Sequence, residues 1–396
     1  MMQISPETQL FIREHSSDDV RVLALQAKKY PDIDMPTVIT QIAGRKVAAE
    51  KIPSWWEIEK IWYPKHLSLE QCSSEITARY KARLLQGDSL TDLTGGFGID
   101  CSFLATGFKS ATYVERQEEL CEIAAHNFPV LNLNHINIKN EDGVTYLQVM
   151  SPVDCLFLDP ARRNEHGGKT VAISDCEPNV AELEELLLQK ANRVMIKLSP
   201  MLDLSLALKE LKQTQEVHIL SVNNECKELL ILLGQTSPTE ISIHCVNLST
   251  KGTQEEQHFV FTREQEQCSE CTYTDSLETY LYEPNASLLK AGAFRSIAAA
   301  YPVRKLHPNS HLYTSDTFIE NFPGRIFRIV NQCSFNKKEV KENLADLKKA
   351  NVTVRNFPAT VAELRKRIHL AEGGDTYLFA STLNNGQKVL IRCEKV

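Results

Sequence analysis

Four acidic residues in the first half of the chain stand at or just after short apolar runs of β-strand composition. Asp92, Glu115, Asp142 and Asp159 follow four different runs of this kind. In open α/β sheets, ligands bind outside the carboxyl ends of the strands. The four carboxyl groups are therefore candidates for a single ligand site.

A glycine-rich turn follows the first run, in the sequence Asp92-Leu93-Thr94-Gly95-Gly96-Phe97-Gly98. Glycines 95, 96 and 98 let the backbone turn sharply and let a ligand approach without a clash with a Cβ atom. Glu115 comes 17 residues after Gly98, close to the ~20-residue spacing of an acid that binds a ribose. Asp142 could accept a proton from an adenine amino group. The alternatives are a solvated strand-end acid at Glu115 and a plain turn residue at Asp142.

The sharpest motif is Leu158-Asp159-Pro160-Ala161-Arg162-Arg163. A carboxylate followed directly by Pro160 has a fixed backbone direction and outward carbonyls, and it can hold an amine with its lone pair toward an electrophilic methyl group. We assign catalysis to Asp159 and Pro160, by positioning and by assisted proton removal. The alternative is that Asp159 caps the next turn. Arg162 and Arg163 could bind a substrate phosphate or stack on a base, or form ion pairs in a loop. The segment Gly167-Gly168-Lys169 could form a substrate lid.

Apolar runs alternate with helical stretches between about residues 89 and 233, which predicts a parallel sheet with helical crossovers. Residues before this region have helical composition, and the adjacent Trp55 and Trp56 are expected to bury apolar surface rather than to stack on a base. The turn Asn384-Asn385-Gly386 indicates a hairpin near the end of the chain. We expect five segments: an N-terminal helical region (1–65), an α/β domain (66–235), a β-hairpin extension (236–276), a mixed segment (277–321) and a small α/β module (322–396).

The order Asp92 to Asp100, Glu115, Asp142 and Asp159-Pro160 resembles the signature positions of class I S-adenosylmethionine-dependent methyltransferases over about residues 70 to 235. The resemblance implies a Rossmann-like sheet and S-adenosylmethionine as cofactor, bound by the residues Asp92, Thr94, Gly95, Gly96, Gly98, Glu115 and Asp142. In that family the acid at the position of Asp92 lies near the amino-acid end of the cofactor.

The Asp159 motif resembles the (Asp/Asn)-Pro-Pro-aromatic motif of amino-methylating enzymes. Ala161 and Arg162 replace the second proline and the aromatic residue, so the group that stacks on the target base is unassigned. A cysteine-dependent uracil mechanism is rejected, because the next strand ends in Lys197-Leu198-Ser199-Pro200. Lys197 would suit an alkoxide-forming mechanism, but no full Lys-Asp-Lys-Glu set is recognisable in the sequence.

The C-terminal module resembles a THUMP-like domain, and residues 281–294 resemble the ferredoxin-like segment that precedes it in a group of bacterial methyltransferases. THUMP domains imply RNA binding. From Phe322 to Val396 the chain has 14 basic and 7 acidic residues, a net charge of +7, while the rest carries −14. Basic residues recur on two predicted helices of the module: Lys337, Lys338, Lys341, Lys348, Lys349, Arg365, Lys366 and Arg367. Such charges could follow a phosphate backbone.

Composition limits the remaining possibilities. The chain has 396 residues, 42% of them hydrophobic, and 11 cysteines scattered along its length, which indicates reduced thiols in a cytoplasmic protein. No apolar run is long enough to span a membrane. The one Cys268-Ser269-Glu270-Cys271 motif lacks a second pair, and the histidines show no ligand spacing, so we expect no metal site.

Three functions remain open at this stage. The first is an S-adenosylmethionine-dependent RNA methyltransferase that modifies a base amine of tRNA or rRNA. The second is a methyltransferase on a small molecule or a protein, with the C-terminal module in a structural role. The third is a non-catalytic RNA-binding protein with a degenerate cofactor fold.

Overall fold

The computed structural model describes residues 4–162, 172–236, 239–251 and 256–396. The chain divides into two compact units. The first comprises Met1–Gln215 with Leu230–Thr239, and the second comprises Glu216–Leu229 with Glu240–Val396. Each unit has its own core, so each is described separately below.

The chain begins with helices, as the composition predicts. Their bounds are α1 (Pro6–Glu14), α2 (Val20–Leu25), α3 (Met35–Lys51), α4 (Pro53–Trp56), α5 (His66–Gln71) and α6 (Glu75–Ala82). The Ser5 side chain accepts the Thr8 amide at the start of α1, and Asp34 accepts the Thr37 amide at the start of α3, so these two helices begin at side-chain caps. An apolar cluster around Phe11, Val38 and Ile42 holds α1, α2 and α3 together.

A large sheet follows, with the strand order β11-β10-β8-β9-β7-β4-β1-β2-β3. The strands of this sheet are β1 (Ser89–Asp92), β2 (Ser110–Glu115), β3 (Ile136–Asn140), β4 (Val153–Leu158), β7 (Ala191–Leu198), β8 (Thr214–Val222), β9 (Glu225–Gly234), β10 (Ser242–Leu248) and β11 (Gln257–Thr262). The pairs β1–β2, β1–β4, β2–β3 and β4–β7 are all parallel. The carboxyl ends of β7, β4, β1 and β2 therefore lie along one edge of the sheet.

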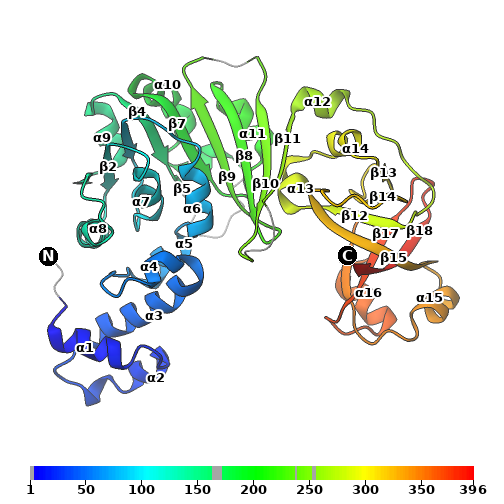
Figure 1. The fold of residues 1–396 in the computed structure, drawn as a ribbon, viewed down its shortest axis with the longest axis horizontal. Coiled ribbons are helices and arrows are strands. Elements are labelled where there is room, and N and C mark those ends of the chain that lie inside the picture. The colour runs from blue at the N-terminus through cyan, green and yellow to red at the C-terminus, as the bar shows by residue number, and fades with distance from the viewer. Residues whose placement is uncertain (1–3, 163–171, 237–238, 252–255) are drawn as a thin grey trace. The chain divides into compact units, whose positions relative to one another are not determined.

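Helices connect the parallel strands, as Figure 1 shows. They are α7 (Ile99–Ala105), α8 (Glu118–Val130), α9 (Gly143–Val149), α10 (Val180–Lys190) and α11 (Leu204–Glu210). Every residue of α7 is buried, so this helix lies against the sheet directly behind the glycine-rich turn. The alternation of strands and helices confirms the predicted Rossmann-like α/β fold.

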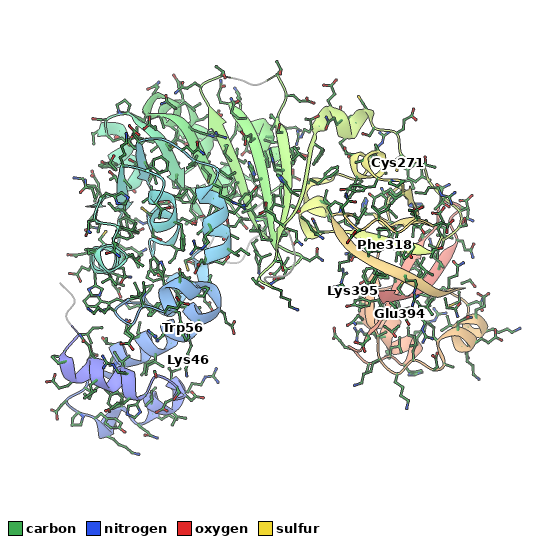
Figure 2. All side chains as sticks on the ribbon, viewed as in Figure 1. Lys46, Trp56, Cys271, Phe318, Glu394 and Lys395 are labelled. Atoms are coloured by element: carbon green, nitrogen blue, oxygen red, sulfur yellow. The ribbon has the colours of Figure 1, made fainter. Side chains whose placement is uncertain are left out.

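The adjacent tryptophans Trp55 and Trp56, both expected to be buried, differ in their exposure. Trp55 is 2% exposed, and its ring lies edge-on to Phe97 of the glycine-rich turn at 5.2 Å between ring centroids. Trp56, labelled in Figure 2, is 41% exposed. The Arg45 guanidinium lies over its ring, 5.7 Å from the ring centroid. Burial was the right prediction for Trp55 and the wrong one for Trp56, because adjacent residues of a helix point in different directions.

The second unit contains a seven-stranded sheet with the order β13-β14-β12-β15-β18-β17-β16. Its strands are β12 (Tyr280–Pro284), β13 (Arg304–Lys305), β14 (Tyr313–Ser315), β15 (Gly324–Ser334), β16 (Asn351–Val354), β17 (Thr376–Thr382) and β18 (Lys388–Lys395). Its helices are α12 (Arg263–Cys268), α13 (Ala286–Ala291), α14 (Ser296–Ala300), α15 (Lys337–Leu344) and α16 (Val361–Ile368). The predicted hairpin joins β17 to β18, and Gly386 in its turn has φ +87°.

One buried carboxylate connects three strands of this second sheet. Glu283 on β12 is 1% exposed, and both its oxygens are engaged by guanidinium groups. Arg325 on β15 donates to it through Nε at 2.8 Å, and Arg355, directly after β16, donates at 3.0 Å. The negative charge of Glu283 is therefore paired with two guanidinium groups from other parts of the sheet.

Two further findings bear on the sequence-based expectations. Within the described ranges, no helix combines the length and the apolar character needed to cross a membrane. All 11 cysteines are free thiols.

Candidate active site

Four strand ends in the first unit position the predicted site residues. Asp92 ends β1, Glu115 ends β2, Asp159 follows β4, and Lys197 is the penultimate residue of β7. Asp92 pairs in register with Phe157, two residues before Asp159. The sequence-based expectation that these acids share one edge of the sheet is met for Asp92, Glu115 and Asp159.

The glycine-rich turn closes tightly over the end of β2. The Gly95 amide donates to the Val114 carbonyl at 2.9 Å. A Cβ atom on Gly95 would come within 2.3 Å of the buried Tyr113 ring, so no larger residue fits there. Gly96 and Gly98 have φ values of +55° and +87°, the left-handed region that favours glycine. The turn therefore brings bare backbone to the strand end, where a ligand can approach it.

Glu115 is held in place by this turn. One carboxylate oxygen accepts the Gly96 amide and the other accepts the Gln117 amide, both at 2.8 Å. The side chain is buried, with 8% of the residue exposed. Each oxygen keeps a second lone pair, so Glu115 can still accept two hydroxyl protons from a ribose. It is not the solvated strand-end acid of the alternative interpretation.

Asp92 has the most unusual environment in the site. It is 1% exposed, and its Oδ1 accepts the Thr94 amide at 2.9 Å. Its Oδ2 is buried without a hydrogen-bond partner among the described residues. Burial raises the pKa of Asp92 to about 8, against the opposing effect of the Thr94 amide. A buried oxygen with no donor fits a cationic ligand group, because a cation would supply both the missing proton donor and the missing charge.

Asp142 has a structural role at the start of α9. Its Oδ1 accepts the amides of Val144 and Thr145, both at 3.0 Å, so it is the N-cap of this helix. The next residue, Gly143, lies so close to β1 that a Cβ atom on it would meet the Leu93 carbonyl oxygen at 2.1 Å. The Asp142 loop is therefore adjacent to the glycine-rich turn, and the exposed Asp142 side chain lies at its rim.

A hydrogen bond connects Asp159 to the glycine-rich turn. Its backbone amide donates to the Thr94 hydroxyl at 2.6 Å, while the following Pro160 is buried. The Asp159 side chain keeps 35% exposure, and its Oδ2 accepts the Lys197 ammonium at 2.5 Å. Burial raises the pKa of Asp159, and the Lys197 charge opposes that rise. Thr94 thus connects the expected cofactor turn to the expected catalytic corner.

A buried network of charges behind Asp159 was missed in the sequence analysis. Asp100 at the start of α7 pairs with Lys81 of α6 at 2.9 Å and with Lys197 at 3.3 Å, and its Oδ2 accepts the Ser73 hydroxyl at 2.7 Å. The Lys81 side chain has no exposed surface. Burial acts to raise the pKa of Asp100, but the two ammonium groups together lower it to about 2.

A sequence signal for this network existed in Lys197, a charged residue inside an otherwise apolar strand. Buried lysines are rare unless they are paired, so this position predicts a carboxylate nearby. Nothing in the sequence links Lys81 to it, because the contact depends on how α6 lies against α7.

The predicted substrate-binding residues follow shortly after Pro160. The backbone of Ala161 and Arg162 forms the short strand β5, which pairs with β6 (Cys176–Glu177). Arg163 and the predicted Gly167-Gly168-Lys169 lid lie outside the described residues. The roles of both arginines remain predictions.

Comparisons with known proteins identify two C-terminal domains and a relative of the whole chain. Residues 280–323 match a ferredoxin-like domain, and residues 324–395 match the family model described as THUMP domain-like. The first of these matches ends at residue 323 and the second begins at residue 324. A comparison with curated proteins gives no match.

Among solved structures, a protein from Porphyromonas gingivalis W83 described as a candidate methyltransferase is 34% identical. The match covers 100% of both chains with a TM-score of 0.88. An rRNA methylase from Streptococcus thermophilus is 16% identical. The match covers 40% of this chain and 93% of that protein, with a TM-score of 0.30. The full-length match, together with the Rossmann-like sheet and the two C-terminal domain matches, shows that the chain belongs to a family of bacterial class I methyltransferases with a ferredoxin-like segment and a C-terminal THUMP-like domain.

Proposed function

We propose that this chain is an S-adenosylmethionine-dependent methyltransferase that acts on a base amine of structured RNA. The observation that carries the cofactor assignment is the buried Asp92 Oδ2, which has no donor among the described residues. Asp92 would bind the ammonium group of the cofactor and Glu115 its ribose. The backbone of Gly95, Gly96 and Gly98 would line the cofactor, and Asp142 would face its base. When bound, the cofactor supplies an electrophilic methyl group.

The acceptor is assigned to the Asp159 corner. Its Oδ2 contacts Lys197, so Oδ1 is the oxygen that would accept a hydrogen bond from an exocyclic amine. Pro160 fixes the direction of the backbone there. Positioning of the amine and electrostatic support of the positive charge that develops on it are the contributions we ascribe to these residues.

A hydroxyl acceptor is the second candidate, and the Lys197 contact favours it. A hydroxyl group must lose its proton to become a strong nucleophile. The Asp159 carboxylate would accept that proton, and the adjacent Lys197 ammonium would stabilise the alkoxide. Lys197 is buried, paired with Asp159, and close to Lys81 through their shared partner Asp100. The sequence alone did not reveal this cluster of lysines and aspartates.

The substrate class rests on the charge of the C-terminal module. Eight of its 14 basic residues lie on or next to α15 and α16, and all six lysines among them are exposed: Lys337, Lys338, Lys341, Lys348, Lys349 and Lys366. Arg365 and Arg367 are partly engaged, by Glu372 at 3.5 Å and by the Phe335 ring at 4.1 Å. Exposed lysines suit a phosphate backbone, because binding releases condensed counterions without first breaking an ion pair.

Reversal of three of these charges is expected to weaken RNA binding in a salt-dependent way. In the variant Lys337→Glu/Lys338→Glu/Lys341→Glu, the slope of log K against log salt should fall by roughly 0.7–0.9 for each phosphate that the module no longer neutralises. Filter binding or fluorescence anisotropy on bulk tRNA and rRNA fragments measures this slope. The matched control Lys28→Glu/Lys29→Glu/Lys60→Glu changes exposed lysines in the N-terminal region by the same charge. Equal losses in both variants would contradict a specific role for the C-terminal module.

The acceptor is tested by mass spectrometry of RNA nucleosides from cells with and without this protein. The proposal expects one base-methylated nucleoside to disappear with the protein. Loss of a ribose-methylated nucleoside would select the hydroxyl alternative. No change in RNA, together with S-adenosylmethionine binding in calorimetry, would favour a small molecule or a protein as substrate. Absence of cofactor binding, with RNA binding retained, would identify a non-catalytic RNA-binding protein.

A further inference from the structure

Three side chains with metal-ligating atoms converge in the second unit, and none of them is assigned to methyl transfer. Glu216, His218 and His244 each offer one donor atom, and these atoms lie within 4.8 Å of one another. The sequence analysis found no ligand spacing among the histidines, because these residues lie on strands that are distant in sequence and adjacent in the sheet.

Strand geometry places the three side chains on one face. Glu216 and His218 are two residues apart on β8, so they point to the same side. His244 on β10 is the register partner of His218. Val217 and Ile243, the neighbours of these residues along β8 and β10, point to the opposite face of the sheet. They are 0% and 1% exposed. Within the cluster, Glu216 and His244 are half-buried, while His218 is 2% exposed.

The contacts within the cluster resemble the spacing of ligands around one ion. The His218 Nε2 and the Glu216 Oε2 are 3.2 Å apart. Ligand atoms of a tetrahedral zinc ion are separated by about 3.3 Å, given Zn–N and Zn–O distances of about 2.0–2.1 Å. The His218 and His244 rings are stacked, with centroids 4.3 Å apart.

A fourth residue supports His244 from the neighbouring strand. The Nδ1 atom of His244 lies 3.1 Å from Nε2 of the exposed His258 on β11. At least one ring must be neutral for this hydrogen bond to form. Ligating histidines typically donate their second ring N–H to such a partner, which fixes the tautomer. The ligand atom of His244 would then be Nε2.

We propose that Glu216, His218 and His244 bind one late first-row divalent metal ion, of which Zn²⁺ is the natural probe, and that His258 orients His244. Two imidazoles and one carboxylate suit zinc and its neighbours better than Mg²⁺ or Ca²⁺, which prefer oxygen ligands. The ion joins β8 to the β10–β11 hairpin, and water completes its coordination. This site is independent of the proposed methyl transfer.

The test uses the full chain without a histidine tag, stripped with EDTA and dialysed. Calorimetry with Zn²⁺ alone is expected to give one ion per chain, and Co²⁺ is expected to give visible absorption bands typical of low coordination number. Zn²⁺ should also raise the melting temperature, because it binds the folded state. His244→Ala and the isosteric Glu216→Gln should each weaken the affinity at least ~10-fold.

The control is His369→Asn. His369 is exposed and ends α16 with φ +56°, a conformation that asparagine tolerates, so metal affinity should not change. His258→Ala should weaken binding less than His244→Ala, and an equal loss would overturn the orienting role of His258. Failure of the unmodified chain to bind Zn²⁺ and Co²⁺ would overturn the site, as would wild-type affinity in folded His244→Ala and Glu216→Gln. Circular dichroism of each variant establishes that it is folded.

Discussion

Replacing Asp159 with alanine is expected to lower the rate of methyl transfer by about 10²- to 10⁴-fold, the range associated with a general acid–base or positioning group. The affinity for S-adenosylmethionine should change by less than about threefold, because the side chain acts on the acceptor. The link to the cofactor turn is the Asp159 backbone amide, which donates to Thr94 and survives the substitution. Lys197 keeps Asp100 as a partner, so the buried charge is not stranded.

The measurement is transfer of a labelled methyl group to RNA from cells that lack this protein, with cofactor affinity measured by calorimetry. Asp88→Asn is the control, since its side chain is 69% exposed and pairs only at the surface with Lys109. Undiminished turnover in Asp159→Ala would remove Asp159 from the catalytic site. Loss of cofactor binding together with turnover would instead make Asp159 part of the cofactor site.

The variant Asp159→Asn separates the two candidate acceptors. An asparagine oxygen still accepts a hydrogen bond from an amine but lacks the carboxylate charge, so a base-amine enzyme should lose some activity and still retain more than Asp159→Ala. Methylation of a hydroxyl acceptor would need both charges of the Asp159–Lys197 pair. The neutral asparagine amide removes the negative charge of that pair. Activity as low as that of Asp159→Ala would therefore support the hydroxyl acceptor.

The sequence predicted those parts of the fold that depend on residues close together in the chain. The glycines at 95, 96 and 98 predicted a tight turn, and two of them adopt the positive φ values that require glycine. Asn385-Gly386 predicted the β17–β18 hairpin. The Rossmann-like order followed from apolar runs that alternate with helical stretches.

Other features depend on contacts between elements, which periodicity cannot reveal. The pairing of Lys81 with Asp100 needs α6 to lie against α7, and His244 meets His218 only because β10 adds to β8 in parallel. A hairpin was expected within residues 236–276, and β10 pairs antiparallel with β11, but periodicity does not reveal that β10 also pairs with β8. Trp55 and Trp56 show the same limit within one short helix, because only one of the two faces the glycine-rich turn.

Replacing Asp92 with asparagine is expected to weaken S-adenosylmethionine binding and at the same time to stabilise the ligand-free protein. A charge-assisted hydrogen bond contributes about 1.5–3 kcal/mol, so the affinity should fall roughly 10- to 100-fold. The stabilisation follows from the environment of the carboxylate, which is buried with one oxygen unpartnered among the described residues. Calorimetry and thermal unfolding measure the two effects.

The stabilisation should depend on pH with a definite sign. The pKa of Asp92 is raised from 3.8 to about 8 in the folded chain. Folding therefore favours the protonated acid, and wild-type stability should decline as pH rises from about 4 to about 8. The asparagine side chain does not titrate, so the melting temperature of Asp92→Asn should match the wild type near pH 4. It should exceed the wild type by several degrees, roughly 2–4 °C per kcal/mol, at pH 8.

A fall in cofactor affinity together with a rise in stability distinguishes a ligand-binding carboxylate from a structural one. If Asp92 only held the Thr94 amide, its replacement would lower stability and leave cofactor affinity nearly unchanged. A carboxylate kept unpaired for a cationic ligand destabilises the empty site and gains its partner on binding, which is a common cost of preorganised sites. Added S-adenosylmethionine should therefore raise the melting temperature of the wild type far more than that of Asp92→Asn. The same shift in both proteins would contradict the role of Asp92 and, with it, the proposed cofactor site.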